Sequence, residues 1–267
     1  MSERDHYEHG VPCWVDHASE NPRAAAEFYS GLLAWETEDV MPPEAPGRYF
    51  MARLRGRDVA ALSSQPLEGA PPAWNTYVAV DDADAAAATA SEAGGNVLAG
   101  PFDVFDSGRM AVLQDPSGAV FSVWQAARHI GAGLVNEPGA LAWNELTTRD
   151  VEGSQGFYGA LFGWRTGQLE LDGGRYFTWH LPGGDTGDPQ TSIGGMMPMD
   201  GDIWPSDLPP HWMTYFAVED ADEAAERTPE LGGLVSIAPF DTPAGRIVVV
   251  NDPVGAVVSL LELPQPA

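Results

Sequence analysis

The chain has 267 residues, a length typical of two domains, and 44% of them are hydrophobic, which is enough to bury a core. All 13 of its basic residues are arginine, and its 39 acidic residues give it a formal net charge of -26. Such a charge repels a phosphate backbone, so it argues against nucleic-acid binding and favours cationic small molecules. The absence of lysine excludes a Schiff-base lysine and the lysine of a phosphate-binding loop.

Cysteine content and hydropathy bear on the compartment. Cys13 is the single cysteine, so no internal disulfide can form. The first ten residues carry no apolar run, and no stretch of about 20 apolar residues predicts a membrane span. We therefore expect a cytoplasmic protein, either a monomer with an internal pseudo-dimer or a homodimer.

The first half predicts two helices, each preceded by one strand and followed by three. The first helix is expected at 22–33, because Asn21 can cap it and Pro22 suits its first position. The second is expected at 83–93, begun by Asp81 or Asp82 and ended by the Gly-Gly pair that follows. The strands are expected near 13–18, 34–38, 48–54, 59–63, 75–80, 96–99, 110–113 and 120–125.

The second half of the chain repeats the first. The segment TYVAVDDADAA at 76–86 recurs as TYFAVEDADEA at 214–224, and an Arg-Tyr-Phe motif recurs as well. The offset between the halves grows from 127 to 138 between Phe177 and Trp212, which indicates an 11-residue insertion expected to form a loop. The repeat predicts an α+β fold of four βαβββ units in two domains, 11–127 and 140–263, joined by a linker at 128–139.

Three motifs of the first half carry a family resemblance. They are PRAAAEFYSGLLAW, VDDADAA and DPSGAVFSVW, and the second half repeats them as VEGSQGFYGALFGW, VEDADEA and DPVGAVVSLL. In this order they resemble the vicinal oxygen chelate superfamily, which includes glyoxalase I, bleomycin-resistance proteins, fosfomycin-resistance enzymes and extradiol dioxygenases. The resemblance implies that paired units form a half-open eight-stranded sheet around a ligand cavity, with two such cavities in the chain.

The resemblance also implies where metal ligands would stand. The six corresponding positions hold Trp14, Asn75, Ser122, Trp143, Met213 and Ser259. Divalent ions do not choose such side chains, so we expect no metal and no other cofactor. A displaced ligand set, Glu145 with His180 and His211, is the alternative.

Strand alternation predicts an acid on each cavity wall. If Trp14 and Trp143 face the cavities, so do Asp16 and Glu145, two residues further on. A carboxyl group desolvated among aromatic rings has a raised pKa and can act in acid-base catalysis or pair with a cationic ligand. A structural hydrogen bond to Tyr77 or Tyr215 is the alternative role. The predicted ligand-binding residues are Trp14, Asn75, Tyr77, Ser122, Trp124, Trp143, His180, His211, Met213, Tyr215 and Ser259.

Several other residues are assigned structural roles. His17 has the opposite parity to Trp14 and is expected beneath a helix, and Arg109 and Arg246 are expected to fix turns. The pairs Gly183-Gly184 and Gly194-Gly195 are interpreted as loop hinges. The insertion is expected to form a lid over the second cavity, which predicts that ligand binds mainly in the second half. The lid residues are Met196, Met197, Met199 and Trp204.

Three functions remain open on these grounds. The first is a metal-independent protein that binds or sequesters an aromatic or cationic metabolite or drug, in antibiotic resistance or biosynthesis. The second is a metal-independent lyase, isomerase or cyclase that uses Asp16 or Glu145 as acid or base. The third is a metal-dependent glyoxalase or dioxygenase with displaced ligands.

Overall fold

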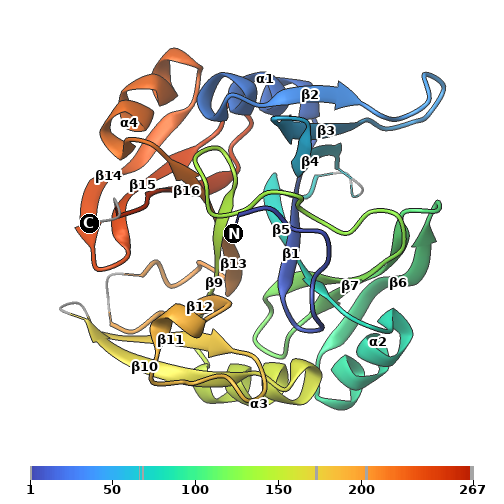
Figure 1. Ribbon diagram of the computed structural model, residues 1–267, viewed down its shortest axis with the longest axis vertical. Coiled ribbons are helices and arrows are strands. Elements are labelled where there is room, and N and C mark those ends of the chain that lie inside the picture. The colour runs from blue at the N-terminus through green and yellow to red at the C-terminus, as the bar shows by residue number, and fades with distance from the viewer. Residues whose placement is uncertain (1, 66, 68, 172–173, 202–203, 265–267) are drawn as a thin grey trace.

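Two eight-stranded sheets form the protein, one from each half of the chain (Figure 1). The computed structural model describes residues 2–65, 67, 69–171, 174–201 and 204–264. The strand order is β2-β3-β4-β1-β5-β8-β7-β6 in the first sheet and β10-β11-β12-β9-β13-β16-β15-β14 in the second. The predicted repeat of βαβββ units and the α+β class are therefore confirmed.

The elements of the two halves correspond one to one in the sheets. Those of the first half are β1 Pro12–Ser19, α1 Pro22–Leu33, β2 Glu36–Asp39, β3 Tyr49–Leu54, β4 Arg57–Ser64, β5 Ala73–Ala79, α2 Ala83–Glu92, β6 Asn96–Val104, β7 Gly108–Gln114 and β8 Val120–Ala126. Those of the second are β9 Leu141–Thr148, α3 Val151–Phe162, β10 Arg165–Leu171, β11 Gly174–His180, β12 Gly194–Pro198, β13 His211–Val218, α4 Ala221–Glu230, β14 Leu234–Thr242, β15 Gly245–Asn251 and β16 Val257–Glu262.

Local sequence accounts for the helix starts. The Asn21 side chain accepts a hydrogen bond from the Ala24 backbone N–H, and Asp82 accepts one from Ala85. These are the side chain–backbone bonds that satisfy free N–H groups at a helix start. Of the two caps proposed for α2, Asp82 is therefore correct.

The prediction of a loop between Phe177 and Trp212 is wrong for one segment. Strand β12 lies there and pairs with both β9 and β11. Gly194 and Gly195 lie inside this strand and are not hinges. A Cβ on Gly195 would overlap the hydroxyl of Tyr176, so glycine is present because a side chain passes close to the backbone.

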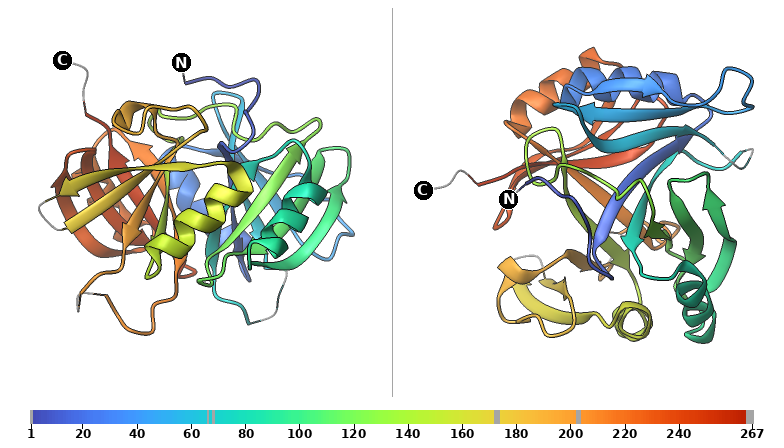
Figure 2. Two further views of the ribbon diagram at one scale, coloured as in Figure 1. Left: turned by 90° about the horizontal axis from the view of Figure 1, so that it is seen from below. Right: turned by 45° about the vertical axis from the view of Figure 1, so that its right-hand side comes forward.

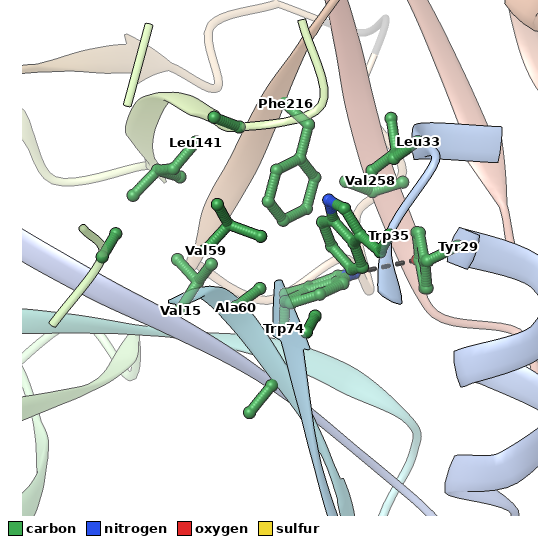
Figure 3. Close-up of a cluster of buried hydrophobic side chains, with 14 of the residues drawn as sticks. Val15, Tyr29, Leu33, Trp35, Val59, Ala60, Trp74, Leu141, Phe216 and Val258 are labelled. Atoms are coloured by element: carbon green, nitrogen blue, oxygen red, sulfur yellow. Dashed lines mark hydrogen bonds between the residues drawn. The ribbon is translucent and has the colours of Figure 1, made fainter. Parts of the chain in front are cut away.

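The helices pair across the two halves. α1 lies beside α4, and α2 lies beside α3 (Figures 1 and 2). Phe216 and Val258 of the second half pack in the same cluster as Trp35 and Trp74 of the first (Figure 3). Each buried cluster is therefore made by both halves, so neither half has a complete core of its own.

A buried hydrogen-bond chain links the halves at each Asp-Pro turn. Asp252 Oδ1 accepts three backbone N–H groups of its own turn, and Tyr29 of α1 donates its hydroxyl to Asp252 Oδ2 (3.2 Å). Trp74 Nε1 donates to the Tyr29 hydroxyl (2.9 Å; Figure 3). The equivalent chain joins Asp115 of the first half to the second half. Trp212 Nε1 donates to the Tyr158 hydroxyl, which donates to Asp115 Oδ2.

His17 belongs to this link and not to a ligand site. Its side chain is fully buried, its ring lies edge-on to Tyr29 of α1, and its Nε2 is 2.9 Å from Asp252 Oδ2. The prediction that His17 packs beneath a helix is confirmed. In the second half the corresponding residue is Leu146.

Arg109 and Arg246 also have structural contacts. Arg109 binds Asp84 of α2 and Asp103 of β6. Arg246 makes the equivalent pairs with acids of α4 and β14, so each arginine fixes a helix to the neighbouring hairpin. None of the described helices is both long and apolar enough to cross a membrane.

Candidate functional site

The two predicted acids lie on the face of each sheet that carries no helix, called here the helix-free face. In the first sheet Asp16 stands opposite Asn75, and Trp14 stands opposite Tyr77. Tyr77 in turn stands opposite Ser122 of β8. Side chains that sequence parity assigned to one face therefore lie together.

Asp16 has several polar neighbours. Tyr77 donates its hydroxyl to Asp16 Oδ2 (2.8 Å), and Asn75 Nδ2 lies 3.5 Å from Asp16 Oδ1. Asn75 Nδ2 also donates to Ser122 Oγ (2.9 Å). Burial raises the pKa of Asp16 to about 6, against the opposing effect of these hydrogen bonds.

Glu145 has fewer polar neighbours. Tyr215 donates its hydroxyl to Glu145 Oε1 (2.9 Å), and Tyr176 makes a second hydrogen bond to the carboxyl. The strand partner of Glu145 is Met213, which offers no donor where the first half has Asn75. Burial raises the pKa of Glu145, and the two tyrosines oppose that effect.

Tyr49 and Tyr176 were missed as site residues. Trp14 Nε1 donates to the Tyr49 hydroxyl (3.3 Å), and Trp143 Nε1 donates to the Tyr176 hydroxyl (3.0 Å). Each tyrosine thus connects the tryptophan to the acid two residues further on. The repeated Arg-Tyr-Phe motif was the signal for both, because the motif recurs in the two halves with its tyrosine in place.

The two helix-free faces differ in how open they are. Trp14 is only 3% exposed and Tyr77 only 6%. Their counterparts Trp143 and Tyr215 are partly exposed. The aromatic rings of the second face are therefore less completely buried than those of the first.

Of the other predicted ligand-binding residues, Trp124 packs edge-on to Tyr77 and Ser259 stands opposite Tyr215, whereas the two histidines make other contacts. His180 is fully buried, and its Nε2 lies 2.8 Å from Thr178 Oγ1. His211 is at the start of β13, with Nδ1 2.9 Å from the Pro209 carbonyl oxygen. Trp124 is buried on β8, and Ser259 is buried on β16.

The predicted lid is wrong for two of its four residues. Met196 is fully buried in the core on β12, and Met199 is also buried. Met197 and Trp204 remain partly exposed. The methionines were interpreted as loop residues because the strand β12 was not recognised.

The titration of Asp16 gives a test of its role. Between about pH 4 and pH 6 Asp16 holds a proton in the folded chain that it releases in the unfolded chain, so the contribution of Asp16 to the free energy of unfolding falls as the pH rises through this range. We expect Asp16→Asn to raise the free energy of unfolding by about 3 kcal/mol at pH 7 and by less than about 1 kcal/mol at pH 4. Urea denaturation at both pH values measures this. Lower stability at pH 7 would show instead that the fold needs the carboxylate.

The family follows from a sequence comparison. The family model described as Glyoxalase/Bleomycin resistance protein/Dioxygenase superfamily matches residues 14–123 and 140–260. The chain belongs to this superfamily. The predicted resemblance is therefore confirmed.

Two relatives match over nearly the whole chain. "Putative glyoxylase CFP32" of Mycobacterium tuberculosis (strain CDC 1551 / Oshkosh) is 42% identical, over 98% of this chain and 98% of that protein. "Anthracycline biosynthesis protein DnrV" of Streptomyces peucetius is 36% identical, over 95% of this chain and 94% of that protein.

Solved structures share the fold at low identity. The Mn(II)-bound glyoxalase from Novosphingobium aromaticivorans has a TM-score of 0.64 at 15% identity, covering 98% of this chain and 83% of that one. The 2,3-dioxygenase LapB from Pseudomonas sp. KL28 has a TM-score of 0.64 at 14% identity, covering 97% and 96%. At these identities the likeness concerns the fold alone.

The side chains of this chain do not fit the metal found in some superfamily structures. The ligand positions implied by the resemblance hold indole, amide, hydroxyl and thioether groups. Across the described ranges, no three His, Cys, Asp or Glu side chains form a group that could hold a metal ion. The displaced set of Glu145, His180 and His211 is therefore wrong, because His180 is buried between threonines.

Two cavities lie among the described residues, and one of them has a predicted ligand-binding residue in its wall. One of about 430 Å³ lies between the end of α1, the linker and the start of α4. The other, of about 160 Å³, lies where the N-terminal segment and the linker meet β9, and Trp143 forms part of its wall. The second cavity therefore adjoins the more open of the two helix-free faces.

Proposed function

We propose that this protein binds a planar aromatic small molecule on the helix-free face of the second sheet, without a metal ion, and that Glu145 is the polar anchor. One observation carries the proposal. Glu145 is a buried acid held by two tyrosine hydroxyls beside aromatic rings that remain open to solvent. A buried carboxyl with so few partners is costly unless a ligand supplies another.

The rings of this face are free for stacking. Among the described residues, no other aromatic ring is stacked on Trp143 or Tyr215 or packed edge-to-face with them, although the Tyr176 hydroxyl bonds to Trp143 Nε1. Aromatic rings pair with a ligand ring at centroid distances of about 4.5–7 Å. A planar aromatic ligand would therefore find a tryptophan and a tyrosine beside one hydrogen-bonding acid.

An apolar wall faces the same side. Strand pairing places Phe240 opposite Ile247, and Ile247 opposite Leu261, two residues along β16 from Ser259. Phe240 is 40% exposed and Ile237 of the same strand is 51% exposed. Exposed apolar side chains gathered on one face are typical of a binding surface.

The chemistry of Glu145 favours a ligand with a donor group. Burial raises the pKa of Glu145 because the desolvated carboxylate lacks a counter-charge, so a ligand hydroxyl or ammonium group would stabilise the ionised carboxyl. The net charge of -26 favours the cationic option at long range. The name of one relative supports an aromatic ligand, since DnrV is called an anthracycline biosynthesis protein and anthracyclines are polycyclic aromatic compounds.

A metal-independent lyase, isomerase or cyclase is the second candidate. Its support is the raised pKa of both acids, which suits proton transfer near neutral pH. Binding and catalysis would use the same face, so they differ only in turnover. Conversion of a bound ligand, detected by mass spectrometry after incubation with the protein, would favour the enzyme.

The role of Glu145 is tested by Glu145→Gln, with Asp16→Asn as the matched control. Glutamine keeps the shape and removes the charge, so we expect the affinity for a planar probe, 2,6-dihydroxyanthraquinone, to fall at least about tenfold. Asp16→Asn should leave that affinity unchanged, because the first face is closed. Isothermal titration calorimetry measures both. Equal affinities in all three proteins would contradict the proposal.

A further inference from the structure

The first half carries the same acid and tyrosines as the second, but the chain itself covers them. After β8 the linker runs across the front of the molecule toward β9 (Figure 1). The His129 backbone N–H donates to the Ser107 carbonyl oxygen (3.0 Å), and the His129 carbonyl oxygen accepts from Trp124 Nε1 (2.8 Å). These bonds fix His129 above β1.

The His129 ring lies where the first face would otherwise be open. Its centroid is 4.5 Å from that of Trp14, with the two rings edge-to-face, and 5.9 Å from that of Trp124. Trp124 also lies edge-on to Tyr77, at 6.4 Å. The two aromatic residues of the first face that match Trp143 and Tyr215 are therefore both covered by other rings of the chain.

Polar contacts do not explain the position of this ring. His129 Nε2 is buried and has no hydrogen-bond partner among the described residues, and Nδ1 lies 3.8 Å from Asp58 Oδ2. Burial lowers the pKa of His129, so the ring is neutral at about pH 7. Packing against the two tryptophans holds it, as packing would hold an aromatic ligand.

Among the described residues of the second half, no such cover is present. Leu261 stands in the place of Trp124, two residues after the serine of the last strand in each half. A leucine side chain is smaller than an indole ring and cannot stack edge-on with Tyr215. Trp143 and Tyr215 accordingly remain partly exposed.

We infer that His129 and Trp124 occupy, in the first half, the place that a planar aromatic ligand takes in the second. The inference rests on the proposed function. The chain then binds one ligand per molecule and carries a second, closed site over Asp16. Asp16 keeps its hydrogen bonds to Tyr77 and Asn75, so the closed site retains its own polar anchor.

The double variant Trp124→Leu/His129→Ala tests the inference by opening the first face. With 2,6-dihydroxyanthraquinone in isothermal titration calorimetry, we expect one bound equivalent for the wild type and two for the double variant. Adding Asp16→Asn to the double variant should weaken the new site at least about tenfold and return the count to one. Adding Glu145→Gln should weaken the original site instead.

The folding of each variant is measured separately from its binding of the probe. Each single variant and the double variant are melted by circular dichroism, and the single variants are titrated if the double variant does not unfold cooperatively. Two equivalents in the wild type, or one in a folded variant, would overturn the inference and leave the proposed function standing. A wild type that binds no probe would contradict the proposed function. In that case the double variant still tests the inference. One bound equivalent that is lost when Asp16→Asn is added would support the inference, and no bound equivalent would overturn it.

Discussion

Asp115→Ala is expected to lower the free energy of unfolding by about 4 kcal/mol, because it breaks a buried network that joins the two halves. Asp115 Oδ1 accepts the backbone N–H groups of Ser117, Gly118 and Ala119, and Oδ2 accepts the hydroxyl of Tyr158 from the other half. Alanine removes the side-chain acceptor of the Ser117 and Ala119 N–H groups and of the Tyr158 hydroxyl, whereas the Gly118 N–H keeps its bond to the Asp115 carbonyl oxygen. Denaturation by guanidinium, followed by circular dichroism, measures the change.

Two variants with smaller expected effects on the free energy of unfolding serve as comparisons for this prediction. Asp115→Asn keeps an acceptor for the turn and should cost less than alanine. Asp84→Ala removes an exposed partner of Arg109 and should change the free energy of unfolding far less than Asp115→Ala does. Equal effects of Asp115→Ala and Asp84→Ala would contradict the view that the Asp-Pro turns hold the halves together.

Gly195→Ala is expected to weaken binding of the anthraquinone probe by about 100-fold. Gly195 stands beside Glu145 across the strand pair, and a Cβ there would overlap the Tyr176 hydroxyl and lie 2.8 Å from Trp143 Nε1. Tyr176 would have to leave, and Glu145 would lose one of its hydrogen bonds. Calorimetry with the probe measures the loss.

The matched control for Gly195 lies in the other half. Ala61 stands beside Asp16 in the same register, so the first half already accepts a methyl group at this position. Ala61→Gly should leave probe affinity unchanged. A Gly195→Ala protein that binds as tightly as the wild type would show that Tyr176 is not part of the site.

Much of the fold could be predicted because the sequence repeats. The pattern of each element in one half could be checked against its copy in the other half. The helix start at Asn21 and the shared face of Trp14 and Asp16 followed from local rules of capping and alternation. Strand β12 was missed because its Gly-Gly pair is typical of loops. Glycine is needed at position 195 because the Tyr176 side chain passes close to the backbone, and that contact is set by tertiary packing.

The site was harder to predict for the same reason. Parity placed Asp16 and Glu145 on the correct faces, but sequence alone could not distinguish a covered face from an open one. That difference depends on His129, a linker residue outside the motifs, whose ring reaches Trp14 only in the folded chain. His180 and His211 are plausible ligand-binding residues by residue type alone. In the folded chain the His180 ring contacts the Thr178 hydroxyl, whereas the His211 ring contacts the Pro209 carbonyl oxygen.

A crystal structure of the protein with 2,6-dihydroxyanthraquinone tests the central claim most directly. We expect the ring system to lie against Trp143 and Tyr215 of the second half, with a hydroxyl group within hydrogen-bond distance of the Glu145 carboxyl. We expect His129 to remain against Trp14 in the first half. A probe bound in the cavity between α1 and α4, or one held through a metal ion, would contradict the account.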